Sequence, residues 1–277
     1  MFDTAGPRAK RWIRILTVVS IIVILAVLAL AYYQFYASGA LAPSKWLTFT
    51  NGPTITYFIG ALGKTLLAAA TAGVIALPLG LLLALGRLSR HVILRWPSIA
   101  VIEVFRAVPV LLIIYVFMFA LPAYGLNVDT FWKLVLPIGL CAGAVIAEVF
   151  RAGVLALPRG QNEAGLAIGL TGGKSFRLVV FPQALRIVIP ALVAQLTIVV
   201  KDSAFGYVVS YPELLQSGRV LIANTGDLVQ TYIVVTVIYI LVNMLISAGA
   251  RVLEKRLSRR AGRPVLSLGA RRGAGMA

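Results

Sequence analysis

Cysteine, histidine and acidic residues are the groups that this sequence has least of. Its 277 residues include one cysteine, Cys141, one histidine, His91, and 9 aspartates and glutamates. One cysteine excludes a disulfide framework within the chain and a cysteine-based metal site, and one histidine disfavours a histidine-based site. A membrane-embedded enzyme would need a convergent set of acids, bases or metal ligands, which this composition does not offer. We therefore expect no catalytic residue, no metal and no cofactor.

Long apolar runs are abundant instead. The chain is 60% hydrophobic and 13% charged, and several runs reach the ~20 residues that cross a ~30 Å hydrocarbon core. This predicts an all-α, polytopic membrane protein with about six spans, at residues 13–33, 58–85, 97–121, 134–150, 185–200 and 231–250. Residues 40–42 (ALA) resemble a signal-peptidase site, but the first run is too long for a signal peptide, so we expect an uncleaved anchor.

The net charge of +17 is distributed as in a membrane protein. Most lysines and arginines lie before residue 15, at 87–95, at 151–186 and from Arg251 onward, that is, at the ends of apolar runs. This is the positive-inside bias and not a nucleic-acid groove. It predicts a cytoplasmic N-terminus and C-terminus, with residues 39–51 and 121–129 outside. The Gly/Arg-rich tail, residues 252–277, is predicted to be disordered.

One polar segment, residues 161–186, interrupts the hydrocarbon on the predicted cytoplasmic side. Its GGKS, residues 172–175, lacks the first glycine of a phosphate loop, because Ile168 stands there, and no strand precedes it. Asn162 is expected to cap a short helix with Glu163 in its first turn. Gly165 and Gly169, four residues apart, would then form one smooth docking face. The alternative is a loop helix packed on its own bundle.

The sequence EVFRA occurs twice, and each copy holds a glutamate and an arginine three residues apart: Glu103 with Arg106, and Glu148 with Arg151. Such neighbours on one helix face compensate each other's charge near lipid. We expect structural ion pairs, with a gating or pathway role as the alternative. Arg106, followed by Pro109, lies deeper and is the better pathway candidate.

Three further segments complete the interpretation. Lys201 and Asp202 end a span, so they are candidates for the substrate pathway, with a mutually satisfied pair as the alternative. GLCAG, residues 139–143, is a small-residue helix-packing face. Residues 211–227 are too polar for a span and are expected to form an outer loop that folds over the bundle or re-enters it.

Residues 161–186 resemble the E-A-A…G…I-x-L-P signature of ABC importer permeases. The chain has Gly165 in place of the second alanine, Val179 in place of isoleucine and Phe181 in place of leucine, all small or apolar. The flanking sequences are similar to the polar-amino-acid branch: FRAVPVLL at 105–112, LPRGQ at 157–161, FPQALRIVIP at 181–190 and KDSAF at 201–205. The resemblance covers about residues 60–251.

The resemblance implies a function and a set of partners. It implies a five-helix permease domain over residues 58–251, so residues 1–57 would hold an additional helix and an outer loop. A coupling helix near 161–177 would seat in separate ATPase subunits, which hydrolyse the ATP. The residues implied in coupling are Glu163, Ala164, Gly165, Gly169, Lys174 and Pro182.

The further expected partners are a second permease, an extracytoplasmic binding protein, a polar amino acid and lipid, in a bacterial cell membrane. GPRAKR at residues 6–11 and the additional helix resemble actinobacterial glutamate permease subunits. An ion-driven secondary transporter is the alternative function.

Overall fold

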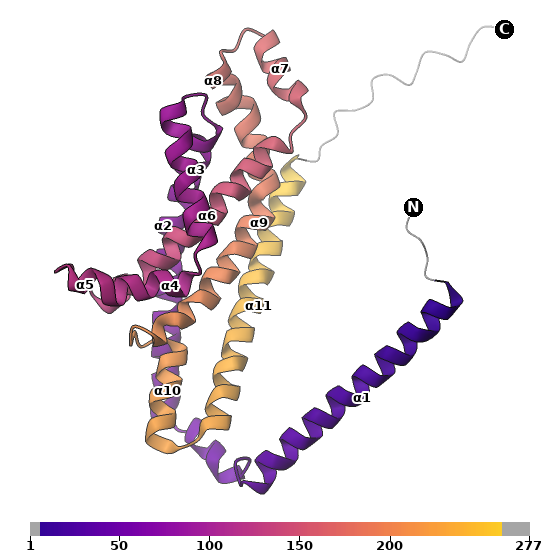
Figure 1. Cartoon of the computed structure of the whole chain (residues 1–277), viewed down its shortest axis with the longest axis vertical. Coiled ribbons are helices and arrows are strands. Elements are labelled where there is room, and N and C mark those ends of the chain that lie inside the picture. Colours follow the sequence, from indigo (N-terminus) through magenta and orange to yellow (C-terminus); the bar gives the residue numbers. More distant parts are fainter. Residues whose placement is uncertain (1–5, 262–277) are drawn as a thin grey trace. The chain divides into compact units, whose positions relative to one another are not determined.

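The structure is a computed structural model, and it describes residues 6–261. All regular elements in that range are helices (Figure 1). The long ones are α1 (Pro7–Ala37), α2 (Gly52–Leu88), α3 (Val92–Ala107), α6 (Thr130–Leu155), α9 (Phe181–Asp202) and α11 (Leu228–Ala261). The short helices are η1 (Pro43–Phe49), α4 (Val110–Tyr115), η2 (Val116–Ala120), α5 (Leu121–Ala123), α7 (Arg159–Ala167), α8 (Gly172–Ser175), η3 (Phe176–Val180), η4 (Ser203–Tyr207) and α10 (Leu214–Thr225).

Five helices within residues 6–261 are long and apolar enough to cross a membrane, and six spans result if the bent pair α3–α4 is one span. The predicted all-α fold with about six spans is therefore confirmed. The chain divides into two compact units. Unit 1 comprises the residues up to 57 with 218–234, and unit 2 comprises 58–217 with the residues from 235 onward.

Unit 1 contains α1, which exposes apolar side chains all around its surface. None of the residues in its most apolar stretch is buried. A helix that is apolar on every side needs lipid or another chain around it. Elsewhere in the unit, Thr48 Oγ1 donates to Asp227 Oδ2 over 2.9 Å, and the Gln230 amide donates to the carbonyl of Ala40. These bonds join η1 and its preceding turn to the beginning of α11.

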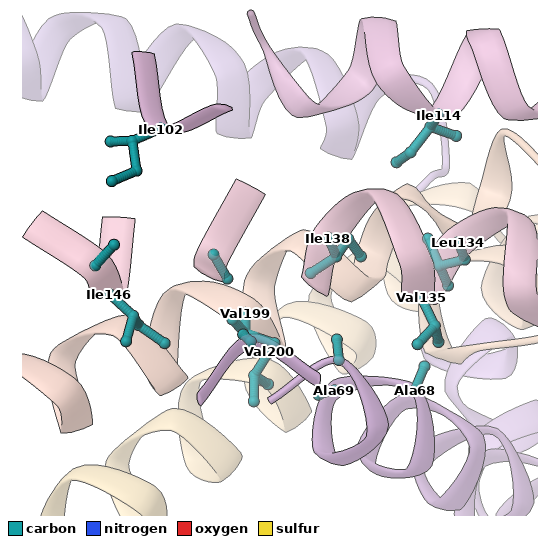
Figure 2. Close-up of a cluster of buried hydrophobic side chains, with 14 of the residues drawn as sticks. Ala68, Ala69, Ile102, Ile114, Leu134, Val135, Ile138, Ile146, Val199 and Val200 are labelled. Atoms are coloured by element: carbon teal, nitrogen blue, oxygen red, sulfur yellow. The ribbon is translucent and has the colours of Figure 1, made fainter. Parts of the chain in front are cut away.

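Unit 2 has its core where α6 packs between α2, α9, α3 and α4. Figure 2 shows Leu134, Val135 and Ile138 of α6 above Ala68 and Ala69 of α2. The α2–α6 contact uses small residues, as expected for helices that associate in lipid. A Cβ added to Gly143 would lie 3.4 Å from the Ala76 carbonyl and 2.9 Å from Leu79 Cδ2. The predicted packing face at residues 139–143 is confirmed.

The third span is not the continuous helix that residues 97–121 predict. It breaks at Val108, and α3 and the segment from Val110 to Ala123 are bent by 98°. Pro109 explains the break, because it has no N–H for the carbonyl of Phe105, and because the residue before a proline avoids the helical region. Val108 accordingly adopts an extended backbone with φ −88° and ψ 126°.

Three other expectations are wrong in part. The predicted disordered tail, residues 252–277, is helical as far as Ala261, where α11 ends, and residues 262–277 lie outside the described residues. Residues 211–227 are not simply a loop, since they contain α10, a helix of 12 residues. At about 1.5 Å per residue this helix is too short to span hydrocarbon. The fifth span begins earlier than residue 185, because a helical run continues from Gly172 to Tyr207 over 36 residues.

Candidate functional site

The polar segment between α6 and α9 folds into a compact hairpin of α7 and α8, at one end of unit 2 (Figure 1). Asn162 does not cap α7, so that expectation is wrong. The helix begins one turn earlier, after Pro158, whose own φ of −57° and extended ψ of 135° suit the position before a helix. The Asn162 side-chain oxygen instead accepts a hydrogen bond of 2.8 Å from Ser175 Oγ. The amide thus joins α7 to α8.

Gly165 and Gly169 do not share a helix face, contrary to the prediction. Gly165 is buried against α8, and a Cβ there would lie 2.4 Å from Ser175 Oγ. Gly169 lies beyond the end of α7 with φ +85°. The Gly169 N–H donates to the Leu166 carbonyl over 3.0 Å, and the Leu170 N–H donates to that of Gly165 over 3.1 Å. This is a Schellman C-cap, so Gly169 ends the helix by adopting the left-handed conformation.

The contacts of α7 divide it into two faces. The inner face holds Gln161, Asn162 and Gly165, and the Gln183 amide donates to Gln161 Oε1 over 2.9 Å. The outer face, which we define as Gly160, Glu163, Ala164 and Ala167, is exposed along its whole length. Helical spacing of three and four residues places these four on one side. Three of them have no bulky side chain, so this face, rather than Gly165 and Gly169, offers bare backbone to a partner.

Besides Gly169, two other predicted coupling residues lie outside α7. Lys174 is exposed on α8, and Pro182 is exposed in the first turn of α9. Before Pro182 the helix widens into the π turn η3, where the Phe181 N–H donates to the carbonyl of Phe176, five residues earlier. A π turn shifts the carbonyl with which a proline ring would otherwise collide. Pro122 follows the π turn η2 in the same way.

The two EVFRA copies form one ionic cluster rather than two separate pairs. Arg151 Nη2 lies 2.9 Å from Glu148 Oε2, and Arg106 Nη1 lies 3.8 Å from Glu103 Oε2. Arg87, at the end of α2, connects them: its Nη1 lies 2.8 Å from Glu103 Oε1 and 3.0 Å from Glu148 Oε1. The ionic cluster therefore joins α2, α3 and α6.

Sequence reasoning missed Arg87 in this role. The available signal was a single arginine at the end of an apolar run with no acidic neighbour in its own helix. Glu103 and Glu148 each have an arginine three residues later in their own helix. That spacing did not indicate that both glutamates also share Arg87. Spacing within a helix predicts pairs, but a contact between helices depends on the packing of α2 against α6.

No ion pair joins the substrate-pathway candidates to one another in the part of the chain that the structure describes. Arg106 is exposed and lies beside Glu103. Lys201 is exposed at the end of α9, whereas Asp202 is half-buried. Among residues 6–261 no ion pair is formed by Lys201 or Asp202, so they are not the mutually satisfied pair offered as the alternative. Three or more metal-binding side chains do not cluster anywhere in the same range.

Comparison with known proteins identifies the family. Residues 76–259 match the family described as "Binding-protein-dependent transport system inner membrane component". The chain belongs to this family. The permease is 38% identical, over 231 residues, to the glutamate transport system permease protein GluD of Corynebacterium glutamicum, covering 82% of this chain and 84% of that protein. It is 34% identical to the glutamine transport system permease protein GlnP of Escherichia coli, covering 75% and 91%.

A solved structure agrees with the fold of the permease. The crystal structure of an amino acid ABC transporter with histidines is similar with a TM-score of 0.72 and 28% sequence identity, covering 76% of this chain and 98% of that chain. The resemblance to ABC importer permeases of the polar-amino-acid branch is thus confirmed, and the permease is a multi-pass inner-membrane component.

Proposed function

We propose that the permease carries polar amino acids inward as the membrane subunit of an ATP-driven importer, with glutamate as the first substrate to test. A second permease, an extracytoplasmic binding protein and separate ATPase subunits complete the importer. The permease itself holds no cofactor and performs no covalent chemistry. The glutamate assignment is supported by the 38% identity to GluD.

The observation that carries this proposal is the outer face of α7. The inner face is fixed to the bundle by the Ser175–Asn162 and Gln183–Gln161 hydrogen bonds, so a force on α7 reaches the start of α9. The outer face leaves Glu163, Ala164 and Ala167 exposed. An ATPase groove that holds this face would move α7 and α9 together when ATP closes the ATPase pair. A ligand that favours one of two states shifts the spans between them.

The outer face can be tested with one substitution and a matched control. Ala164→Leu adds a side chain where the ATPase would meet bare backbone, and overpacking of this kind typically costs about 1–3 kcal/mol. The affinity for the ATPase should fall roughly fivefold to more than a hundredfold. The control is Ala26→Leu, at an exposed alanine of α1, where a leucine suits lipid. The measurements are co-purification of the ATPase and ATP-dependent uptake in vesicles.

Wild-type co-purification and uptake in Ala164→Leu would refute docking through this face. An ion-driven secondary transporter, the alternative function, predicts uptake that follows an ion gradient and ignores the ATPase. Competition of labelled glutamate with the twenty amino acids, in vesicles that hold the whole importer, tests the substrate separately.

A further inference from the structure

A cleft with a volume of about 810 Å³ lies in unit 2 beside the α7–α8 hairpin. Three membrane spans end at it. Leu88 is the last residue of α2, Leu155 is the last residue of α6, and Gly172 begins the helical run to Tyr207. At about 1.5 Å per residue, the 37 residues of α2 and the 36 residues of the run from Gly172 exceed the ~30 Å hydrocarbon core. Their ends therefore extend past the hydrocarbon, and we infer that the cleft lies at the level of the headgroups.

The lining of the cleft combines two chemistries. Its walls are mainly apolar, with Leu88, Leu155, Phe176 and Val180 among them, and Leu155 leaves 62% of its surface exposed. Two arginines, Arg90 and Arg159, also line it. We call this feature the arginine cleft. An apolar wall with cations beside it matches an amphiphile that carries a negative charge.

Neither arginine is neutralised by the permease itself. The ion pairs of the ionic cluster involve neither Arg90 nor Arg159, and neither arginine forms another ion pair within residues 6–261. The polar amide of Asn162, which also lines the cleft, is already bonded to Ser175. The two guanidinium groups are therefore the unpaired polar groups of the lining, and guanidinium binds phosphate in a bidentate manner.

We propose that the arginine cleft binds the headgroup of an anionic phospholipid, with Arg90 and Arg159 on the phosphate and the acyl chains along the apolar wall. Basic pockets between transmembrane helices at the headgroup level bind such lipids. A soluble anion would use the two arginines but leave the apolar wall exposed to water. The stripe Arg159, Asn162, Leu166 of α7 that faces the cleft is separate from the outer face. The lipid site thus does not depend on the proposed docking of the ATPase.

The test measures lipid bound to the intact importer by native mass spectrometry. The complex is titrated with palmitoyl-oleoyl phosphatidylglycerol and with phosphatidylcholine of the same acyl chains. The wild type should prefer phosphatidylglycerol. Each basic residue near an anionic headgroup is worth about a fivefold change in affinity, so the double variant Arg90→Gln/Arg159→Gln should lose roughly thirtyfold. The control Arg95→Gln/Arg177→Gln removes two exposed arginines that do not line the cleft.

A second variant fills the cleft without removing charge. Gly173 lines it, and a Cβ at Gly173 meets no atom within 4 Å, so a side chain at this position begins in open space, and Gly173→Leu should also displace the lipid. Unchanged phosphatidylglycerol affinity in the double variant, or an equal loss in the control pair, would overturn the proposal. The proposal would also be overturned if the double variant lost the ATPase but still bound phosphatidylglycerol. That result would indicate that the two arginines bind an acidic segment of the ATPase.

Discussion

Nη1 of Arg87 lies 3.0 Å from Oε1 of Glu148, which joins the end of α2 to the first residue of the second EVFRA copy in α6. Only 16% of the Glu148 side chain is exposed, against 53% for Glu103. The half-buried carboxylate therefore depends more on this cation. The ionic cluster fixes the relative position of three spans at one end of unit 2.

Arg87→Gln should lower the stability of the permease. The expected loss lies between the ~1 kcal/mol of an exposed pair and the 3–5 kcal/mol of a buried one, because Glu148 keeps Arg151 as a second partner. Thermal unfolding of the purified permease in detergent measures it. Arg95→Gln, at an exposed arginine outside the ionic cluster, is the control. Equal melting temperatures in the two variants would show that Arg87 contributes nothing.

Gly80→Ala should disrupt the packing of α2 on α6. The added Cβ would lie 2.5 Å from Ile146 Cγ2 and 2.8 Å from the carbonyl oxygen of Gly143, and backbone cannot move aside as a side chain can. We expect a cost of about 1–3 kcal/mol. Gly63→Ala is the matched control in the same helix, because its Cβ meets no atom within 4 Å. The yield of folded permease should fall for Gly80→Ala and stay unchanged for Gly63→Ala.

Glu213 should make stability depend on pH. Burial raises the pKa of this carboxyl from 4.5 to about 7, although hydrogen bonds from the N–H groups of Leu215 and Gln216 and from Tyr239 Oη act in the opposite direction. Between these two pH values the folded state holds a proton that the unfolded state has lost. The contribution, up to about 3 kcal/mol, is therefore full below pH 4.5 and is lost as the pH rises to 7.

Melting temperatures of the permease between pH 5 and pH 8 measure this effect. Glu213→Gln, which cannot ionise, should flatten the fall with rising pH. Glu163→Gln removes an exposed acid of α7 and should leave the fall as it is in the wild type. If the melting temperature of Glu213→Gln fell with rising pH as steeply as that of the wild type, another group would be responsible for the pH dependence.

Lys201→Ala should lower glutamate uptake while the importer still assembles. Lys201 is exposed at the end of α9 and has no ion pair within the described part of the chain, so its charge is available to an acidic substrate. A hydrogen bond to a charged group is worth about 1.5–3 kcal/mol, so uptake at low substrate should fall roughly tenfold or more. Lys201→Arg keeps the positive charge and should retain most of the glutamate uptake. Wild-type uptake in both Lys201→Ala and Arg106→Ala would rule out a charge-matched pathway.

The basic segments predict the orientation of the permease, and cysteine labelling tests this prediction. In a Cys141→Ser background, Lys174→Cys should react only from the cytoplasm, because arginines and lysines gather on that side. Leu126→Cys, in the exposed turn before α6, should react only from outside. Both positions are exposed, so a membrane-impermeant maleimide can reach them. The reverse labelling pattern would invert the whole topology and the proposed site of ATPase docking.

The sequence predicted the spans well because their signal is composition, which needs no knowledge of neighbours. It also predicted that Gly139 and Gly143 pack against a helix. It failed where the partner of a residue determines its role. Gly165 and Gly169 are four residues apart, and on that spacing they share a face only if the helix continues through both.

The left-handed φ of Gly169 ends the helix first, and a sequence pattern alone does not distinguish a capping glycine from a packing glycine. Pro109 is a comparable case. A proline in an apolar run is compatible with a kinked span, and only the packing of α4 on α6 fixes the bend at 98°.

That bend has a consequence for hydration. The last turn of α3 leaves carbonyl groups without helical partners, and Pro109 brings no N–H to the carbonyl of Phe105. In hydrocarbon each such group would cost several kcal/mol, so lipid-exposed breaks of this kind do not occur. The free carbonyl groups at the bend near Val108 must therefore contact water or be covered by protein. A water-accessibility footprint along residues 104–112 would trace where the membrane domain opens to solvent.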